Sequence, residues 1–284
     1  MPNISKKSMY KLLAADLDGT LVNEEKIITP RTFESLMEAQ RRGVRLAIST
    51  GRPVEGARHL VEQLRMKDYG GCLISYNGAL VHDCATGDVI FSQPINTALL
   101  PLLLRRAEEH CCAFVVYQPT HVLTTDASSP YVQYSGRNNR LPVHEAEDFL
   151  GEARGPLYKG LLVGDPDIMP ALRDTLTEEL RGQMDFCLSE TFFLECLAPG
   201  ISKMKGLEAV AGHMNIKREE IMAFGDSDND VSMIRYAGLG VAMGNAKKNA
   251  LHAADLVPAS NDKDCIATVV EQYVLCNASP SSAF

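Results

Sequence analysis

The sequence lacks several patterns that would place it in a specialised class of protein. No run approaches the roughly 18 apolar residues that a transmembrane helix needs, so we expect no membrane partner. No basic block is longer than a pair such as Lys6-Lys7, and the formal net charge is -8. Because nucleic-acid binding depends on Lys and Arg side chains that neutralise phosphates, these features argue against a nucleic-acid partner.

Sequence features of secreted and disulfide-rich proteins are also missing. The first ten residues contain Lys6 and Lys7 but neither an apolar core nor a small-residue cleavage site, so we expect no secretory signal and a cytoplasmic location. Eight cysteines in 284 residues do not indicate a disulfide framework, and Cys111-Cys112 are adjacent rather than spaced as C-x-x-C. No Cys or His has a partner at metal-ligand spacing, which disfavours a zinc site.

The sequence does contain enough apolar residues for a substantial core. Apolar residues make up 45% and charged residues 23% of the chain, which is typical of a globular protein. With about 150 residues per domain as a guide, the length suggests two domains.

The first and last parts of the chain alternate between strand and helix patterns. Helices are expected to begin near Pro30 and Pro53, and another is expected at 203–213. The predicted strands between them are 11–17, 44–49, 72–76 and 221–224. Such alternation predicts an α/β fold whose core is a doubly wound, Rossmann-like parallel sheet.

The middle of the chain has a different rhythm. Apolar stretches at 81–83 and 89–91 flank Thr86-Gly87, which predicts an antiparallel hairpin rather than a crossover. Hairpins and helices then mix up to about residue 191, with a loop-rich stretch around Ser128-Ser129-Pro130. We therefore predict a core formed by residues 1–83 and 192–284, with an α+β domain inserted at 84–191.

Two carboxylates follow the first predicted strand. Asp16-Leu17-Asp18-Gly19-Thr20 comes directly after the apolar run Leu12 to Ala15, and ligands of open α/β sheets bind beyond the carboxyl ends of the strands. Because strand side chains alternate with a period of two, Asp16 and Asp18 are expected to point to the same side. One can then attack or bind metal while the other transfers a proton. A capped turn is the simpler alternative, since Asp-Gly favours tight turns.

Two weaker signals occur at the end of a predicted strand and at the start of a predicted helix. In Ser49-Thr50-Gly51-Arg52, a hydroxyl and backbone N–H groups near a helix start can hold phosphate oxygens, although such a sequence is more often only a turn or a helix cap. Lys203 follows Ser202 at a helix start, where a lone lysine is usually a solvated charge. Each of these two signals indicates a phosphate site only in combination with the other motifs.

A second acidic cluster, Gly225-Asp226-Ser227-Asp228-Asn229-Asp230, ends the predicted strand at 221–224. Carboxylates, carbonyls and waters are the ligands that Mg²⁺ prefers, and it usually takes only one or two protein carboxylates. A Ca²⁺ loop is disfavoured because its sixth position is Val231 instead of Gly and its twelfth is Ala237 instead of Glu. Two like charges about 4 Å apart repel by roughly 4 kcal/mol at an effective dielectric of 20, so these carboxylates need a cation before they can face a phosphate.

Together the four motifs resemble the haloacid dehalogenase superfamily of phosphatases, Cof-type branch, in which a large α/β cap is inserted into the core. The resemblance spans nearly the whole chain and includes Ser75-Tyr76-Asn77-Gly78-Ala79 and Gly244-Asn245-Ala246. It implies that Asp16 is the nucleophile, and that Asp18 protonates the leaving alcohol and then activates water.

The resemblance also implies how the remaining groups act. Thr50 and Lys203 hold the phosphoryl group, and Mg²⁺ is bound by Asp16, the backbone carbonyl of Asp18 and Asp226, with Asp230 in support. A further set of residues is assigned to substrate and phosphate binding: Gly51, Arg52, Asn77 and Asn229.

The sequence departs from this branch at two positions. Met204 stands where Gly usually follows the lysine, and Cys265 stands where Gly is usual after Asp264. Neither is a catalytic position, so the departures concern the size of the substrate. His121, Arg137 and His144 lie in the predicted cap and are interpreted as ordinary surface residues.

The resulting prediction is a Mg²⁺-dependent phosphatase that hydrolyses small phosphorylated metabolites, first of all sugar phosphates, through an aspartyl-phosphate. A cofactor phosphate such as pyridoxal phosphate or a flavin nucleotide is the second choice of substrate. A sugar phosphomutase with the same nucleophile and metal, and a regulatory module without turnover, are the alternatives. We expect a monomer or a weak homodimer.

Overall fold

The computed structural model describes residues 10–276, and these divide into two compact units. The first unit contains the chain up to Thr50, then Leu60–Phe91, and the chain from Ser202 onward; the second contains Gly51–His59 and Ser92–Ile201. The lysines on which the expectation about a secretory signal rests lie outside the described residues.

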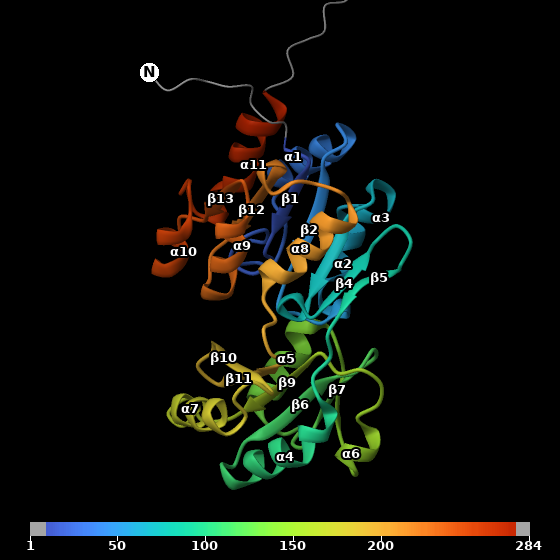
Figure 1. Ribbon diagram of the computed structural model, residues 1–284, viewed down its shortest axis with the longest axis vertical. Coiled ribbons are helices and arrows are strands. Elements are labelled where there is room, and N and C mark those ends of the chain that lie inside the picture. Colours follow the sequence, from blue (N-terminus) through green and yellow to red (C-terminus); the bar gives the residue numbers. More distant parts are fainter. Residues whose placement is uncertain (1–9, 277–284) are drawn as a thin grey trace, which may run out of the picture. The chain divides into compact units, whose positions relative to one another are not determined.

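The first unit is built on a seven-stranded sheet (Figure 1). In spatial order its strands are β13 (Leu239–Ala242), β12 (Ile221–Gly225), β1 (Leu12–Ala15), β2 (Arg45–Ser49), β3 (Cys72–Ser75), β4 (Leu80–Asp83) and β5 (Val89–Ser92). The neighbours from β13 to β3 pair in parallel, and β4 pairs antiparallel to β3. The prediction of a doubly wound parallel core is confirmed.

Helices cover both faces of this sheet, as the alternation of its side chains requires. Leu12 and Ala14 of β1 pack with apolar residues of the helices α8 and α9, whereas Leu13 and Ala15 lie beside α1 and α11. The helices of this unit are α1 (Pro30–Arg41), α3 (Met66–Tyr69), α8 (Lys203–His213), α9 (Val231–Tyr236), α10 (Lys248–Ala253) and α11 (Cys265–Val270). The helix α2 (Val54–Gln63) is divided, because its residues up to His59 group with the second unit. Burial on both faces explains why the central strands are apolar throughout.

Two helices begin where a hydroxyl caps them. The Thr29 side chain accepts a hydrogen bond from the N–H of Thr32, and Pro30 occupies the first turn, where its missing N–H costs nothing. The Ser202 side chain accepts from the N–H of Lys205 and so begins α8. The cap makes Lys203 the first helical residue.

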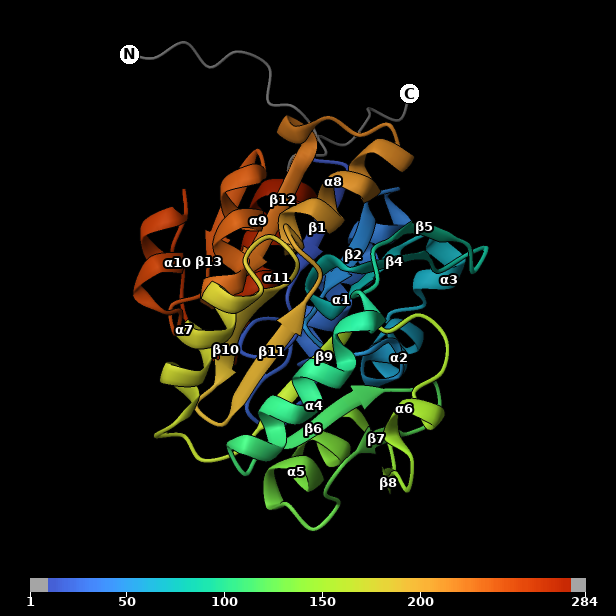
Figure 2. The ribbon, with the colours of Figure 1, turned by 60° about the horizontal axis from the view of Figure 1, so that its bottom comes forward.

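The second unit has a six-stranded sheet of its own, in the order β10 (Asp185–Glu190), β11 (Phe193–Leu197), β9 (Lys159–Val163), β6 (Ala113–Tyr117), β7 (Val122–Thr124) and β8 (Val143–Glu145). All neighbours pair antiparallel except β7 and β8. Its helices are α4 (Leu100–Glu109), α5 (Pro130–Asn139), α6 (Phe149–Glu152) and α7 (Met169–Glu179), and α4 and α7 pack against one face of this sheet (Figure 2).

The boundaries between the units differ from those predicted at 83/84 and 191/192. The strand β5 is hydrogen-bonded to β4, so the first unit continues to Phe91. The strand β11 pairs with β9, so the second unit continues to Ile201. In both places the predicted boundary cut through a hairpin, whose two strands belong to one sheet.

The loop predicted around Ser128-Ser129-Pro130 ends at Ser129, and a helix that was not predicted follows it. Pro130 is the first residue of α5, which continues to Asn139. Gly136 and the asparagines at its end favour helix weakly, so the helix depends on packing. Val132 is fully buried, and Ser135 is hydrogen-bonded to Tyr117 of β6 over 2.8 Å.

Gly78 allows the turn after β3 to lie against the start of α8. Its φ is +103°, and a Cβ there would overlap the backbone oxygen of Ser202. We predict that Gly78→Ala lowers the free energy of unfolding by about 1 kcal/mol for the left-handed backbone and by about 1–3 kcal/mol more for the overlap.

The matched control for this substitution is Gly87→Ala. Gly87 also has a positive φ, +80°, but a Cβ there would have nothing within 4 Å. Urea unfolding should therefore give the control only the backbone penalty of about 1 kcal/mol. Equal losses in the two variants would contradict the close approach of Gly78 to Ser202.

Candidate active site

The acidic motifs meet where two neighbouring parallel strands end. Asp16 follows β1 and Asp226 follows β12, and these strands pair in register up to Ala15 and Phe224. From β1 the chain runs outward through β2 and β3, and it later returns to the other side of β1 as β12. The carboxyl ends of β1 and β12 thus form a topological switch point, which is where open α/β sheets bind ligands.

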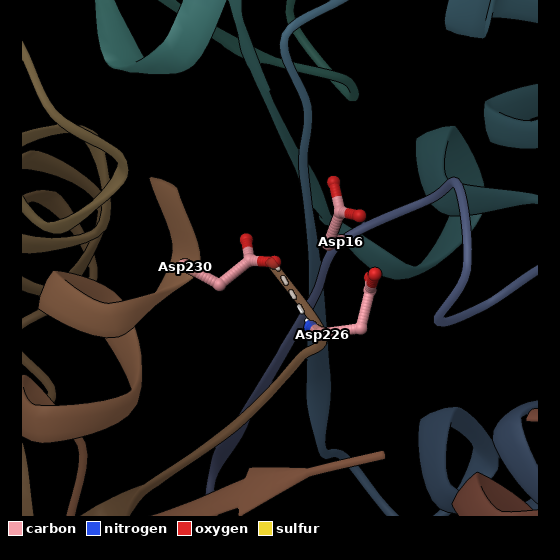
Figure 3. A group of neighbouring side chains, drawn as sticks. All are labelled: Asp16, Asp226 and Asp230. Carbon is pink, nitrogen blue, oxygen red and sulfur yellow. Dashed lines mark hydrogen bonds between the residues drawn. The ribbon is translucent and has the colours of Figure 1, made fainter. Parts of the chain in front are cut away.

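Three carboxylates converge there, as Figure 3 shows. Asp16, Asp226 and Asp230 each offer a carboxylate oxygen that lies within 4.8 Å of the others, and all three side chains are buried. The Lys203 ammonium donates to Oδ1 of Asp16 and to Oδ1 of Asp230, both at 2.6 Å. Lys203 itself is 1% exposed. The interpretation of Lys203 as a solvated charge is therefore excluded.

Burial and mutual repulsion set the charge state of this cluster. Burial raises the pKa of Asp16 well above its usual range, and Asp230 and Asp226 raise it further, against the opposing effect of Lys203. Burial also raises the pKa of Asp226, although hydrogen bonds from Thr20 and Ser227 oppose it. Burial alone would lower the pKa of Lys203, but Asp16 and Asp230 outweigh it and raise that pKa, so the ammonium stays charged.

Asp230 holds the other groups in place. Its Oδ2 accepts hydrogen bonds from the backbone N–H of Asp226 at 3.0 Å and of Ser227 at 2.9 Å, and its Oδ1 accepts from Lys203. The contacts of Oδ2 fix the turn after β12, and the contact of Oδ1 holds the Lys203 ammonium. This arrangement fits the expected supporting role better than direct metal ligation.

The cluster fits a divalent cation. Three carboxyl groups face one ammonium in this buried site, so the acidic groups outnumber the cation by two. The absence of a Cβ at Gly19 keeps this space free, because such an atom would lie 2.7 Å from Oδ2 of Asp226. Carboxylate oxygens are hard ligands of the kind that Mg²⁺ and Ca²⁺ take. Asp16 and Asp226 are the carboxylates best placed to hold the ion.

Asp18, which is expected to point to the same side as Asp16, has an ion-pair partner of its own. Its Oδ1 accepts from the Lys26 ammonium at 2.7 Å, and its side chain is 35% exposed. It is not part of the three-carboxylate cluster. The reason is local: β1 ends at Ala15, and Gly19 has φ +82°, so the period-two alternation of a strand stops before it reaches Asp18.

The residues after β2 are divided between the units. Thr50 is buried in the first unit, where its N–H donates to the Ile74 oxygen at 2.8 Å. Gly51 groups with the second unit. The Arg52 guanidinium donates to the backbone oxygens of Gly56 and Asn138, both at 3.2 Å. The Arg52 guanidinium is thus hydrogen-bonded to backbone oxygens, and its assignment to phosphate binding stays a prediction.

Asn77 and Asn229 are brought together in the first unit. Asn77 has left-handed backbone angles, with φ 57°, and its Oδ1 accepts from Nδ2 of Asn229 at 3.0 Å. Asn77 is buried, whereas Asn229 is exposed.

Two contributors to the site were missed in the sequence, although both lie in quoted motifs. The Thr20 hydroxyl donates to Oδ1 of Asp226 at 2.7 Å and orients it. Asn245 donates to the backbone oxygen of Gly19 at 2.9 Å and so fastens the turn after β1. The Thr20 hydroxyl, which ends the first acidic motif, was an available signal, whereas only the fold brings Asn245 to Gly19.

Comparison with known proteins decides the family. Residues 13–270 match the haloacid dehalogenase-like hydrolase family, which is nearly the whole chain. The chain belongs to this family. The resemblance deduced from the motifs is confirmed, and the protein is a hydrolase of the haloacid dehalogenase superfamily.

Relatives within the family are named as phosphatases. The 5-amino-6-(5-phospho-D-ribitylamino)uracil phosphatase YcsE of Bacillus subtilis is 31% identical over 93% of this chain and 96% of its own. Among solved structures, a haloacid dehalogenase-like hydrolase from Bacteroides thetaiotaomicron has a TM-score of 0.89 and 35% identity over 93% of this chain and 99% of its own. A subclass IIB sugar phosphatase has a TM-score of 0.78 and 26% identity, over 93% and 98%.

The family match and the names of these relatives together show that the chain is a phosphatase of the haloacid dehalogenase superfamily. They also agree with the two-unit fold. Across residues 10–276, none of the helices is both long and apolar enough to cross a membrane.

The Lys203 ion pairs generate a prediction about stability. We expect Lys203→Met to lower the free energy of unfolding by roughly 3–5 kcal/mol near neutral pH, because it leaves buried carboxylates without their cation. The pKa values of Asp16 and Asp226 are already raised in the folded protein, so protonation stabilises the folded state of the variant as pH falls. The loss should therefore be smaller near pH 5 than near pH 7.5.

Urea unfolding in a chelating buffer at both pH values measures this effect. The matched control is Lys205→Met, which removes the same charge two residues later on α8 and leaves the carboxylate cluster intact. A Lys203→Met variant as stable as the control near pH 7.5 would refute the electrostatic account.

Proposed function

We propose that this haloacid dehalogenase-like hydrolase is a Mg²⁺-dependent phosphatase of small phosphorylated metabolites, and that it works through an aspartyl-phosphate on Asp16. The observation that carries the proposal is the buried Asp16 carboxylate at the end of β1, held by Lys203 at 2.6 Å beside Asp226. A carboxylate fixed in this way is suited to attack phosphorus in line with the leaving oxygen.

In the first half of the proposed reaction, an Asp16 oxygen forms a bond to phosphorus while the bond from phosphorus to the ester oxygen breaks. Asp18 gives its proton to the departing alcohol oxygen. In the second half, a water oxygen attacks phosphorus, Asp18 takes the water proton, and the bond from Asp16 to phosphorus breaks. Asp18 must leave Lys26 to reach the substrate, and its 35% exposure leaves it room to turn.

The proposed metal ligands are Asp16, the backbone carbonyl of Asp18 and Asp226, with Asp230 in support. A bound Mg²⁺ neutralises phosphoryl oxygens and favours in-line geometry. Lys203 supplies the remaining positive charge next to the nucleophile. Thr50, Gly51, Asn77 and Asn229 are proposed to bind phosphate or substrate, and Arg52 can contribute only through its backbone while its guanidinium is engaged.

Sugar phosphates are the proposed substrate class. This choice is supported by the structural similarity to a protein described as a sugar phosphatase. The second unit is proposed to act as a cap that selects the substrate. A cofactor phosphate such as pyridoxal phosphate or a flavin nucleotide stays the second choice of substrate. The name of the relative YcsE, which describes a phosphate on a ribityl chain joined to a uracil, supports a substrate larger than a simple sugar phosphate. We propose a cytoplasmic monomer or weak homodimer.

A sugar phosphomutase is the remaining alternative. It would share the nucleophile and the metal but return the phosphoryl group to another hydroxyl. A panel of phosphorylated metabolites separates the two reactions, since a phosphatase releases one free phosphate for each ester consumed. Isomeric sugar phosphates with little free phosphate would instead favour the mutase.

The role of Asp16 can be tested by substitution. We expect Asp16→Asn to lower the rate of phosphate release by at least about 10³-fold, because an amide is a poor nucleophile. The matched control is Asp228→Asn, a change of the same kind at an exposed carboxylate that accepts from Asn249 at 2.8 Å. The control should stay within about twofold of the wild-type enzyme. Substantial phosphate release by the Asp16 variant would reject the nucleophile.

Metal dependence is a separate test. Removal of divalent cations with a chelator should reduce phosphate release to the level of Asp16→Asn, and added Mg²⁺ should restore it, because phosphate cannot approach the buried carboxylates without a cation. The melting temperature should also rise on Mg²⁺ addition, since a ligand that binds only the folded state stabilises it. Full turnover after chelation would eliminate the metal from the proposal.

A further inference from the structure

Lys159 is a buried lysine in the second unit that the proposed chemistry does not use. Its side chain is 5% exposed, and its ammonium donates to Oε1 of Glu195 at 2.8 Å and to the backbone oxygen of Gly51 at 2.6 Å. Glu195 is also buried. Gly51 is the residue that directly follows Thr50.

The pair lies on one face of the six-stranded sheet. In the antiparallel register Lys159 faces Leu197 and Glu195 faces Leu161, so the two charged residues are diagonal neighbours on the same side. The other side of these strands is apolar, with Phe114, Leu162, Leu194 and Cys196 all fully buried. The polar pair is therefore confined to one face.

Burying an ion pair in the face of a sheet costs free energy. Apolar residues of similar size usually serve stability as well or better, because burial removes two charges from water. Burial alone would lower the pKa of Lys159, but Glu195 outweighs it and raises that pKa, so the ammonium keeps its charge. A charged donor is thus maintained where it reaches a backbone oxygen.

The contact fixes one peptide unit. Because a trans peptide is planar, a donor that holds the Gly51 oxygen also sets the direction of the Arg52 N–H, on the opposite side of the same plane. One residue earlier, the Thr50 N–H donates to the Ile74 oxygen, and the Thr50 oxygen accepts from the N–H of Asn77 at 3.0 Å. Thr50 is therefore fastened to the first unit and Gly51 to the second.

We propose that Lys159, held by Glu195, is a positioning residue that sets the conformation of the Thr50–Gly51–Arg52 turn for binding the phosphate group. The inference rests on the proposed function in assigning this turn to phosphate. What the inference adds is that the Lys159 ammonium, on the sheet of the second unit, fixes this turn by holding the Gly51 oxygen.

The test uses the double variant Lys159→Met/Glu195→Met, which removes both charges and leaves no unpaired ion. Inorganic phosphate is the probe, measured with Mg²⁺ both as a competitive inhibitor and by the rise in melting temperature that it causes. We expect the inhibition constant for phosphate and the KM to rise by about 10–100-fold, with a smaller change in kcat and a melting temperature near that of the wild type.

The control is Arg106→Met/Glu179→Met, which also removes a cation and a Glu from the second unit, but from a partly exposed pair 2.7 Å long on α4 and α7. It should bind phosphate like the wild type. The single variant Lys159→Arg keeps a cationic donor, so its inhibition constant for phosphate should stay within about threefold of the wild-type value. If the double variant does not fold, the Arg variant decides: a folded Lys159→Arg enzyme whose inhibition constant for phosphate rises by about 10-fold or more overturns the proposal.

The two proposals fail differently. A folded double variant with the phosphate affinity of the wild type overturns the role of Lys159, even if the enzyme is a phosphatase. A wild-type enzyme that releases no phosphate from any substrate overturns the proposed function, while the melting-temperature shift with inorganic phosphate still reports on Lys159. A wild-type protein that phosphate does not stabilise overturns the inference about Lys159 as well.

Discussion

The site depends on one buried ammonium. The Lys203 ammonium lies 2.6 Å from a carboxylate oxygen of both Asp16 and Asp230, and its charge allows these acids to share a buried site with Asp226. The same contacts fix the turn after β12, because the other oxygen of Asp230 holds two backbone N–H groups of that turn. The side chains that balance the charge of the site therefore also fix its geometry.

The charged residues of this site come from elements that are distant in the sequence. Asp16 is delivered by β1, Asp226 by β12 and Lys203 by the first turn of α8, which Ser202 caps. Each side chain follows directly from the end of a strand or the start of a helix. Elements with packed apolar faces thus position Asp16, Asp226 and Lys203, and the turns after β1 and β3 add further groups such as Thr20 and Asn77.

Much of this arrangement could be predicted from the sequence. The helix at Lys203–His213 and the start of α1 at Thr29-Pro30 were readable because caps and apolar spacing are local signals. The meeting of Asp16 and Asp226 followed from the rule that parallel strands end at one edge, whereas the place of Lys203 was implied only by the family resemblance. The helix α5 was not readable, because Gly136 and its terminal asparagines favour helix weakly and its stability comes from contacts with β6.

Side-chain partners were harder to predict than positions. The pairing of Asp18 with Lys26 depends on where β1 ends, and a shift of one or two residues at a strand end changes which way a carboxylate points. The engagement of Arg52 depends on Asn138, 86 residues away, and nothing near Arg52 in the sequence announces it. Long-range partners of this kind are fixed only by the completed fold.

The discontinuity of the first unit has a consequence for how the protein is made. Thr20 and its partner Asp226 are separated by 206 residues, so at typical synthesis rates roughly 10–40 s pass between their emergence from the ribosome. During that interval β1 has only β2 beside it, and its other edge is available to any strand that meets it. Most of the second unit, by contrast, is one continuous stretch that can fold early in the nascent chain. The newly made protein thus builds its second sheet before it can close its first.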